Sequence, residues 1–337
     1  MKYERWDRHP RKWQGGNGGQ GRDLALGGDT VCWRCDPGGG DLDGREIDAA
    51  IEEAARNHLT CWRPDRRTVL RAGLGLLAVP AAHILQSCAT VPVTGRSQLR
   101  LISEAEEARI GVQAFAQLRQ KEVQGGRLLS EQEDPAAHAW VNRVKERVIW
   151  ASGLGNAYKW DYMIINAPKT VNAAAIAGGR IIVFTGILPV AQDDAGLAAI
   201  IGHEVGHVMA HHTAERISQN QLLSVLAVAA GAAGGGDLGM AAVGLGGQVG
   251  FLLPFSRAHE TEADHIGLLL MAKAGYDPRE SVALWQRMEK ASGGSGRGPE
   301  FLSTHPNPGT RINDLETWMP QAWQYYQNPS LPLPTVP

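Results

Sequence analysis

The chain lacks the charge excess, the late cysteines and the long apolar runs that mark several protein classes. Its 337 residues include 33 basic and 35 acidic ones, and this balance gives no general attraction to nucleic acid. All four cysteines lie within the first 88 residues, which excludes a disulfide framework for the rest. After Cys88, no segment has the roughly 20 uninterrupted apolar residues of a membrane-spanning helix. The 41 glycines cluster instead of recurring at every third position, which excludes collagen.

Residues 1–62 are predicted to be a low-complexity, disordered leader. They contain runs of glycine, and only Ile47–Ala55 has a helical pattern. Cys32 and Cys35 form a CxxC that fits a redox pair or half of a zinc site, with Cys61 as a further ligand. A reading frame that begins too far upstream would explain the same composition.

Residues 63–88 are predicted to be an export signal. The basic run Asp65–Arg71, with a twin arginine, precedes the apolar stretch Ala72–Leu85, which is too short to span a bilayer as a helix. The stretch ends in Leu85-Gln86-Ser87-Cys88, which resembles a bacterial lipobox, so Cys88 is the predicted site of lipidation. A signal peptide without lipid and a short membrane anchor stay open as alternatives. The twin-arginine export route and a generic basic region fit equally well.

Residues 89–325 are predicted to form one α+β domain that is mainly helical, followed by a proline-rich tail over residues 326–337. Tyr162–Asn166 and Arg180–Phe184 are short and rich in Ile and Val, which predicts strands. Leu222–Leu253 is apolar but interrupted by glycines and by Asp237, which favours packed helices over a groove and leaves membrane contact open. The predicted helices are Glu104–Arg119, Pro135–Val148, Asp193–Ser218, Glu260–Ala274 and Pro278–Ala291.

Two histidines four residues apart carry the first chemical signal. His203-Glu204-Val205-Gly206-His207 is an HExxH sequence on a predicted helix. Residues four apart share a helix face, so both imidazoles can bind one ion. A catalytic zinc site takes three protein ligands and keeps one position for water, from which Glu204 can take a proton as general base. The alternative is a surface helix with two unrelated histidines.

The third ligand is predicted to be a carboxylate from a later helix. One class of zinc protease carries Gly and His where this chain has Ala210 and Thr213, so that class is rejected. Glu260 and Asp264 share a helix face; we expect Glu260 to bind zinc and Asp264 to accept a hydrogen bond from a ligand histidine. Glu262 lies about 200° away from Glu260 around the helix and is therefore the poorer candidate for the third ligand.

These motifs, with further matching residues along the chain, resemble those of the M48 family of gluzincin-type zinc metalloendopeptidases. This family includes the CAAX prenyl protease, HtpX, BepA and the mitochondrial Oma proteases. The resemblance covers residues 88–320 and implies one zinc ion per chain, an HExxH helix, an ExxxD helix and a small sheet edge beside the active site. Thr94-Gly95-Arg96 is similar to the periplasmic lipoprotein branch. The chain lacks the transmembrane helices of HtpX, and its end at Pro337 predicts that it lacks the helical repeats of BepA. The other matching residues are Ser256-Arg257, Ala263-Asp264, Ala274–Pro278, Val171-Asn172-Ala173, Gly178-Gly179, Thr185-Gly186, Ser303–Pro306 and Arg311-Ile312.

The resemblance also implies a role for His305, which lies in a His-Pro loop that the family places near the metal. His305 is expected to stabilise the oxyanion or, as in BepA-like relatives, to occupy the open zinc position and hold the enzyme latent; a loop histidine without a catalytic part is the alternative. Arg311 is expected to pair with carboxylates and to pack the loop. His211 is expected to support the site or to pack as a polar residue, without being a ligand.

Substrate binding is predicted at Arg180–Phe184, taken as an edge strand beside the zinc. An extended peptide could add to such a strand through main-chain hydrogen bonds, with Ile181 and Val183 on the strand and Asn172 and Ala173 lining the groove. An ordinary core strand is the alternative for this segment.

The leading functional hypothesis is a zinc-dependent endopeptidase that cleaves unfolded or misassembled envelope proteins. Its predicted place is the periplasmic side of a bacterial cell envelope, on the outer membrane, through a lipid anchor. A second hypothesis is a chaperone-like adaptor for outer-membrane proteins with a latent or masked zinc site, and a third is a site that uses another divalent metal. No nucleic-acid partner is expected, and the sequence does not indicate an oligomeric state.

Overall fold

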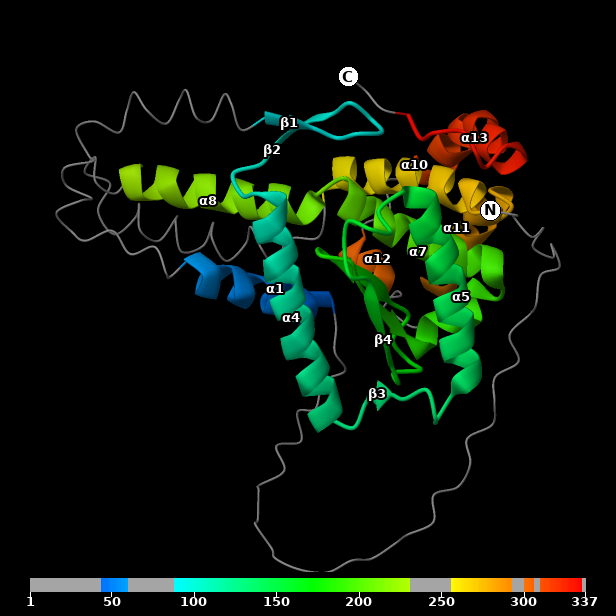
Figure 1. The fold of residues 1–337 in the computed structure, drawn as a ribbon, viewed down its shortest axis with the longest axis horizontal. Helices are drawn as coiled ribbons and strands as arrows, with labels where there is room; N and C mark the ends of the chain where they lie inside the picture. The colour runs from blue at the N-terminus through cyan, green and yellow to red at the C-terminus, as the bar shows by residue number, and fades with distance from the viewer. Residues whose placement is uncertain (1–43, 60–87, 231–255, 293–299, 306–309, 335–337) are drawn as a thin grey trace, which may run out of the picture.

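The computed structural model describes residues 44–59, 88–230, 256–292, 300–305 and 310–334 (Figure 1). The predicted CxxC with Cys61, the apolar stretch Ala72–Leu85 and most of the glycine-rich part of Leu222–Leu253 lie outside these residues. The described part is mainly helical with two small sheets, which confirms the predicted fold class.

Local sequence determines where one long helix begins and where the next one ends. α4 (Glu104–Gln124) begins at a capping box of Ser103 and Glu106, in which each side chain accepts a hydrogen bond from the other residue's backbone N–H. α5 (Pro135–Ser152) ends at Gly153, whose φ of 73° lies in the left-handed region that glycine adopts without strain.

The larger sheet has the strand order β3-β4-β6-β5. β4 and β6 are parallel, whereas β3 and β5 run antiparallel to their neighbours. The strands are β3 (Leu128–Leu129), β4 (Asp161–Ile165), β5 (Ala173–Ile176) and β6 (Arg180–Phe184).

The predicted edge strand is wrong, because β6 lies between β4 and β5. β5 is the edge strand beside β6, as β3 is at the other edge, and it folds back onto β6 through Gly178 and Gly179, which have φ values of 79° and 77°. Alanine is depleted in strands, so the run Ala173–Ala175 gave no strand signal in the sequence.

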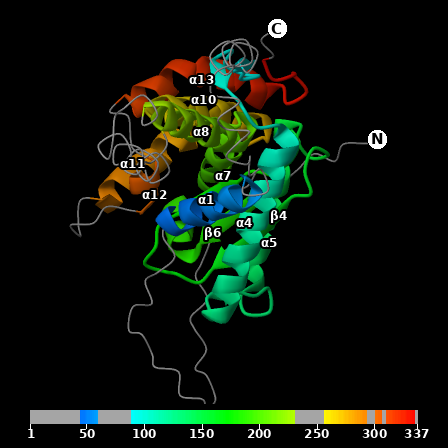
Figure 2. The same cartoon turned by 90° about the vertical axis from the view of Figure 1, so that its left-hand side faces the viewer.

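The sheet separates two parts of the core. α5 and α7 (Asp194–Met209) pack on the face that carries Ile164, Ile181 and Val183. α4 and α1 (Gly44–Leu59) pack on the opposite face, and Figure 2 shows α1 lying across α4.

α1 lies within the segment predicted to be a disordered leader, and the structure differs from that expectation here. Ile47 and Ala54 are buried against the body, and Asp48 accepts a hydrogen bond from Arg216 at 3.1 Å. The helical pattern of this segment therefore supplies an apolar face, and α4 is the surface that covers it.

A short hairpin precedes α4. β1 (Cys88–Thr90) pairs antiparallel with β2 (Ser97–Leu99). Val91 and Val93, between the two strands, are buried in the main core, so the hairpin is anchored to the domain. Cys88 is the first residue of β1, and its lipidation stays a prediction.

α7 packs closely against α10 (Arg257–Lys273) because glycines face each other across the contact. A Cβ added to Gly267 would lie 2.7 Å from the backbone nitrogen of His203, and one on Gly202 would lie 2.8 Å from the carbonyl oxygen of Gly267. The glycines thereby bring the HExxH helix and the ExxxD helix within side-chain reach.

The predicted helix Asp193–Ser218 is two helices. α7 ends at Met209, His211 takes a φ of 53°, and α8 (His212–Ala230) begins at the next residue. A non-glycine residue at positive φ interrupts the helix, so side chains after the break no longer follow the face of α7.

The remaining helices close the C-terminal side. The tail packs at its start: the side chain of Lys273 donates to the carbonyl oxygen of Pro329 at 2.6 Å. Within the described ranges, no helix combines the length and the apolar character needed to cross a membrane. The helices after α10 are α11 (Arg279–Ser292), α12 (Glu300–Thr304) and α13 (Arg311–Gln327). The short helices η1 (Thr185–Ile187) and α6 (Leu188–Ala191) precede α7.

Candidate metal centre

Four buried side chains from three parts of the chain meet at one point. His203 and His207 come from α7, Glu260 comes from the first turn of α10, and His305 follows α12. One donor atom from each lies within 4.8 Å of all the others. Helix geometry explains the first pair, since residues four apart lie one above the other on one face.

The donor set fits a zinc ion in number and in chemistry. His207 Nε2 lies 3.1 Å from His203 Nε2 and 3.4 Å from Glu260 Oε1, and imidazole nitrogens and carboxylate oxygens are donors that zinc accepts. Beside them, Oε1 of Glu204 is buried and makes no hydrogen bond among the described residues, although Nε2 of His305 lies 3.4 Å away. A buried carboxylate oxygen without a hydrogen bond is costly, which indicates a position for water or substrate at the cluster.

Asp264 and Arg311 support this cluster from behind. His203 Nδ1 lies 2.9 Å from Asp264 Oδ1, as expected for a bond that fixes the ligand's tautomer. Arg311 donates to Asp264 Oδ2 at 2.5 Å and to Glu260 Oε2 at 2.9 Å. The Arg311 guanidinium is 1% exposed and lies 3.7 Å from the centre of the Trp285 ring. Arg311 therefore holds the carboxylates of Glu260 and Asp264, in keeping with its expected pairing.

The carboxylates make the cluster favour positive charge. Burial lowers the pKa of His203, but hydrogen bonds with Asp264 and Glu260 outweigh it and raise that pKa to about 10. Burial raises the pKa of Glu260, yet the nearby His305 and His203 bring it below its ordinary value. Burial, together with the surrounding histidines, lowers the pKa of His207. The carboxylates thus favour positive charge at the cluster. A bound cation would supply that charge in place of a proton on His203, because a histidine must be neutral to act as a metal ligand.

Glu204 lies between the cluster and the edge strand. Its Oε2 accepts a hydrogen bond from the backbone N–H of Ala175 in β5 at 2.8 Å. Burial raises the pKa of Glu204 above its ordinary range. A carboxylate with a raised pKa that touches both the metal cluster and the edge strand has the properties of a general base.

His305 stands inside the cluster as a fourth donor. Its Nδ1 lies 3.1 Å from Glu260 Oε1 and 3.2 Å from His203 Nε2, and its Nε2 lies 3.4 Å from Glu204 Oε1. The backbone N–H of Phe301, in α12, donates to the carbonyl oxygen of Val171 at 3.0 Å. That bond holds α12 beside the segment that leads into the edge strand.

The four predicted substrate residues separate into two pairs. Asn172 precedes the edge strand β5 and Ala173 begins it; both are 1% exposed, and Nδ2 of Asn172 has no hydrogen-bond partner in the described part of the chain. Ile181 and Val183 are fully buried on the internal strand β6. Their side chains fill the core, so we do not retain them as peptide contacts.

Sequence reasoning missed the partners of His207. Its Nδ1 lies 2.8 Å from Nδ1 of His212, and His212 Nε2 lies 3.0 Å from Oε2 of Glu262. His211, which shares the extrapolated face of α7, contacts Glu107 at 2.7 Å instead. The break at His211 turns His212 toward His207, and no period of a regular helix predicts that placement.

The model of "Peptidase family M48" matches residues 135–319. Mitochondrial metalloendopeptidase OMA1 of Schizosaccharomyces pombe is 37% identical over 242 residues, which cover 69% of this chain and 66% of the relative. The mitochondrial OMA1 metalloendopeptidase of Homo sapiens is 31% identical over 245 residues, which cover 68% and 46%. The β-barrel assembly-enhancing protease of Escherichia coli is 28% identical over 245 residues, which cover 69% and 48%. The chain thus spans about a third to two thirds of the length of its curated relatives.

These relatives overturn the predicted location. The more identical ones, from fungi, a plant and vertebrates, are mitochondrial, whereas the bacterial proteases match at 25% and 28% identity. The expected place on the periplasmic side of a bacterial outer membrane is therefore wrong, and a lipid anchor and the lipoprotein branch are not supported. The family match itself spans both helices that hold the metal cluster. The chain therefore belongs to peptidase family M48, whose metalloproteases use zinc.

Proposed function

We propose that this chain is a zinc-dependent endopeptidase that cleaves unfolded or misassembled polypeptides at a membrane. The observation that carries the proposal is the meeting of His203, His207 and Glu260 with Glu204 beside them. The names of the relatives support a metalloendopeptidase in general terms and leave the substrate to experiment. We place the peptidase domain within residues 89–325, which contain the family match.

The residues of the chain would divide the reaction between them. When bound, a zinc ion supplies an acidified water and a Lewis acid for a peptide carbonyl oxygen. His203, His207 and Glu260 would hold that ion, with Asp264 and Arg311 orienting two of them. Glu204 would take the proton from the attacking water and deliver it to the leaving amine.

Substrate would bind along β5. The N–H of Ala175 points to Glu204, and the N–H of Ala173 is satisfied by the side chain of Asn172 at 2.9 Å, so both face away from β6. An extended polypeptide could pair with this edge by donating its main-chain N–H groups to the carbonyl oxygens of Ala173 and Ala175, which point the same way as the N–H groups of these residues. Because a folded protein rarely exposes such a segment, this mode favours unfolded substrates.

The position of His305 supports a latent form of the enzyme. Closed sets of four protein donors are typical of structural zinc sites, whereas catalytic sites keep one position open. His305 supplies the fourth donor here, so we propose that it must leave for substrate to enter. The same observation supports the second candidate, an adaptor that binds unfolded membrane proteins and keeps its metal masked.

We also propose a cellular location. The more identical relatives are named as mitochondrial proteins, which favours mitochondria. Some relatives are named for β-barrel assembly, which agrees with membrane proteins as substrates. Within the described residues no helix could span a bilayer, and we propose contact with a membrane without assigning the segment that makes it.

Hydrolysis of unfolded casein by the full chain tests the proposal. We expect cleavage that stops on removal of zinc with a chelator and returns when zinc is added. The His305→Ala variant should cleave faster than the wild type if His305 holds the enzyme latent. If both proteins bind zinc and unfolded casein but neither cleaves it, the adaptor is correct and the protease assignment is wrong.

A further inference from the structure

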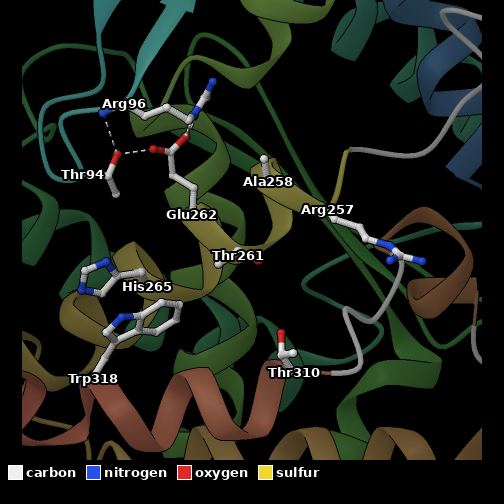
Figure 3. A pocket seen from close by; sticks show the side chains of 9 residues that line it. All are labelled: Thr94, Arg96, Arg257, Ala258, Thr261, Glu262, His265, Thr310 and Trp318. Atoms are coloured by element: carbon white, nitrogen blue, oxygen red, sulfur yellow. Dashed lines mark hydrogen bonds and ion pairs between the residues drawn. The ribbon is translucent and has the colours of Figure 1, made fainter.

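A chain of hydrogen bonds leads from His207 out of the metal cluster to the N-terminal hairpin. His207 Nδ1 contacts His212 Nδ1 at 2.8 Å, and His212 Nε2 contacts Glu262 Oε2 at 3.0 Å. Nε of Arg96 then donates to the same Glu262 oxygen at 2.8 Å. Thr94 donates its hydroxyl to the other oxygen, so both hairpin residues converge on Glu262 (Figure 3).

Metal ligation by His207 fixes the direction of every bond in this chain. If Nε2 of His207 binds the ion, its proton must be on Nδ1, which then donates to Nδ1 of His212. His212 consequently carries its proton on Nε2 and donates to Glu262. Glu262 accepts from both His212 and Arg96, and the positive charge of Arg96 favours its ionised, carboxylate form.

We propose that Arg96 is a positioning residue for the metal ligand His207, acting through Glu262 and His212. The inference rests on the metal site proposed above, and it assigns the hairpin a role in holding zinc.

The two ligand histidines are then supported in different ways. His203 contacts the carboxylate of Asp264 directly at 2.9 Å. His207 reaches its carboxylate, Glu262, only through the intervening ring of His212. Partners of this kind fix ring orientation and raise ligand basicity, and their loss typically lowers metal affinity.

Arg96 is held rigidly enough to act at this distance. Its Nη1 and Nη2 donate to Glu215 at 2.9 and 2.7 Å, while Nη2 also lies 2.7 Å from Glu262. His259 stacks on the ring of His212 with centroids 4.3 Å apart, and its Nε2 lies 3.1 Å from Glu215. The planar fork of arginine can hold two carboxylates at once, which a lysine cannot reproduce.

The contact between Arg96 and Glu262 reaches the protein surface on the Arg96 side. Glu262 is buried, whereas the Arg96 side chain is 28% exposed at a cavity of about 550 Å³ between the hairpin, α10 and α13 (Figure 3). His265 and Trp318 stack on its other wall at 4.4 Å. The relay thus joins the metal cluster to a solvent-facing residue on a separate element.

Zinc affinity of the full chain tests this role. We expect Arg96→Ala and Glu262→Gln each to raise the zinc dissociation constant by about 10- to 100-fold. Arg96→Lys should recover only part of the loss. The Co²⁺-substituted variants should show an altered visible spectrum, because the orientation of His207 changes. If a larger substitution prevents folding, Thr94→Val is a milder test, because it removes only the hydroxyl that donates to Glu262.

Arg127→Ala is the matched control. Arg127 makes a similar two-pronged pair with the buried Glu122, at 2.9 Å for both bonds, at the C-terminal end of α4. Its side chain is 24% exposed, close to the value for Arg96. Arg127→Ala should lower thermal stability without changing zinc affinity or the Co²⁺ spectrum.

A double-variant cycle separates a relay from general destabilisation. In a His212→Gln background, Arg96→Ala should change the zinc dissociation constant less than about twofold, because the connection to His207 is already broken. Additive effects of the two substitutions, or an Arg96→Ala variant that binds zinc like the Arg127→Ala control, would overturn the inference. A wild-type chain that binds no zinc would instead refute the proposed metal site.

Discussion

The backbone N–H of Ala175 donates to Oε2 of Glu204 at 2.8 Å. This bond ties the proposed general base to the edge strand on which a substrate would lie. Glu204 is therefore positioned from two sides, by its own helix α7 and by β5. A shift of the edge strand would move the base relative to the metal cluster, so binding of an extended peptide and proton transfer are expected to be coupled.

Replacing Glu204 with Gln should abolish most hydrolysis while zinc stays bound. The amide keeps the shape of the side chain but cannot take a proton, and general bases typically contribute about 10²- to 10⁴-fold. The measurement is the rate of casein cleavage together with the zinc content of the purified variant. Wild-type rates with one zinc per chain would remove Glu204 from the mechanism.

Replacing Ala175 with Pro should slow hydrolysis by about 10- to 100-fold. The substitution removes the N–H that holds Glu204, and a hydrogen bond to a charged group contributes about 1.5–3 kcal/mol. Proline is tolerated on an edge strand when its nitrogen faces away from the neighbouring strand, as the nitrogen of Ala175 does. Ala175→Ser, which keeps the N–H, should retain more activity than Ala175→Pro, and equal rates for the two would contradict this account.

Replacing Gly267 with Ala should destabilise the protein by about 1–3 kcal/mol, as overpacking of a close contact does. The added Cβ would lie 2.7 Å from the backbone nitrogen of His203, so α7 and α10 must separate. Zinc affinity should fall as well, because the two helices carry different ligands. Urea unfolding and zinc titration check both effects. Gly155→Ala, whose Cβ would meet only Ile149 at 3.9 Å, is the control. Equal stability of the two variants would show that the close approach is not needed.

The contribution of Glu215 to stability should disappear in acid. Burial raises its pKa, but hydrogen bonds with His259 and Arg96 outweigh that effect and lower the pKa to about 2, from an ordinary value of 4.5. The unfolded chain then binds more protons than the folded one between these values, so stability is lost as pH falls through this window. The difference in urea midpoint between wild type and Glu215→Gln should be full above about pH 4.5 and shrink toward pH 2. A difference independent of pH would contradict the ion pairing.

Much of the fold and of the metal cluster could be predicted because the signals are local. The predicted helix Glu104–Arg119 forms as α4, and the capping box at its start joins Ser103 and Glu106, which are only three residues apart. The spacing of His203 and His207 placed both on one face, and both reach the cluster. Helix period and capping depend on neighbours in sequence, so such features survive without knowledge of the tertiary structure.

The errors arose where distant segments decide the outcome. β6 was predicted to be an edge strand because the alanine-rich β5 carries no strand signal, and only pairing with β6 makes it a strand. The predicted helix Asp193–Ser218 breaks at His211, so His212 contacts His207 and His211 contacts Glu107. Glu262 was considered the poorer candidate for the third ligand on angular grounds, and its partner Arg96 comes from a hairpin 166 residues earlier in the chain.

By itself, the sequence determined the type of chemistry. Two imidazoles and a carboxylate on helical spacing, with an adjacent glutamate, fix the donor types and their faces through bonds within single helices. Tertiary structure decided which residue supplies the fourth donor and which residues hold the ligands in place. Glycine contacts bring α7 to α10, α12 brings His305 into the cluster, and the hairpin brings Arg96 to Glu262. These contacts depend on the packing of segments far apart in the chain, which no local pattern encodes.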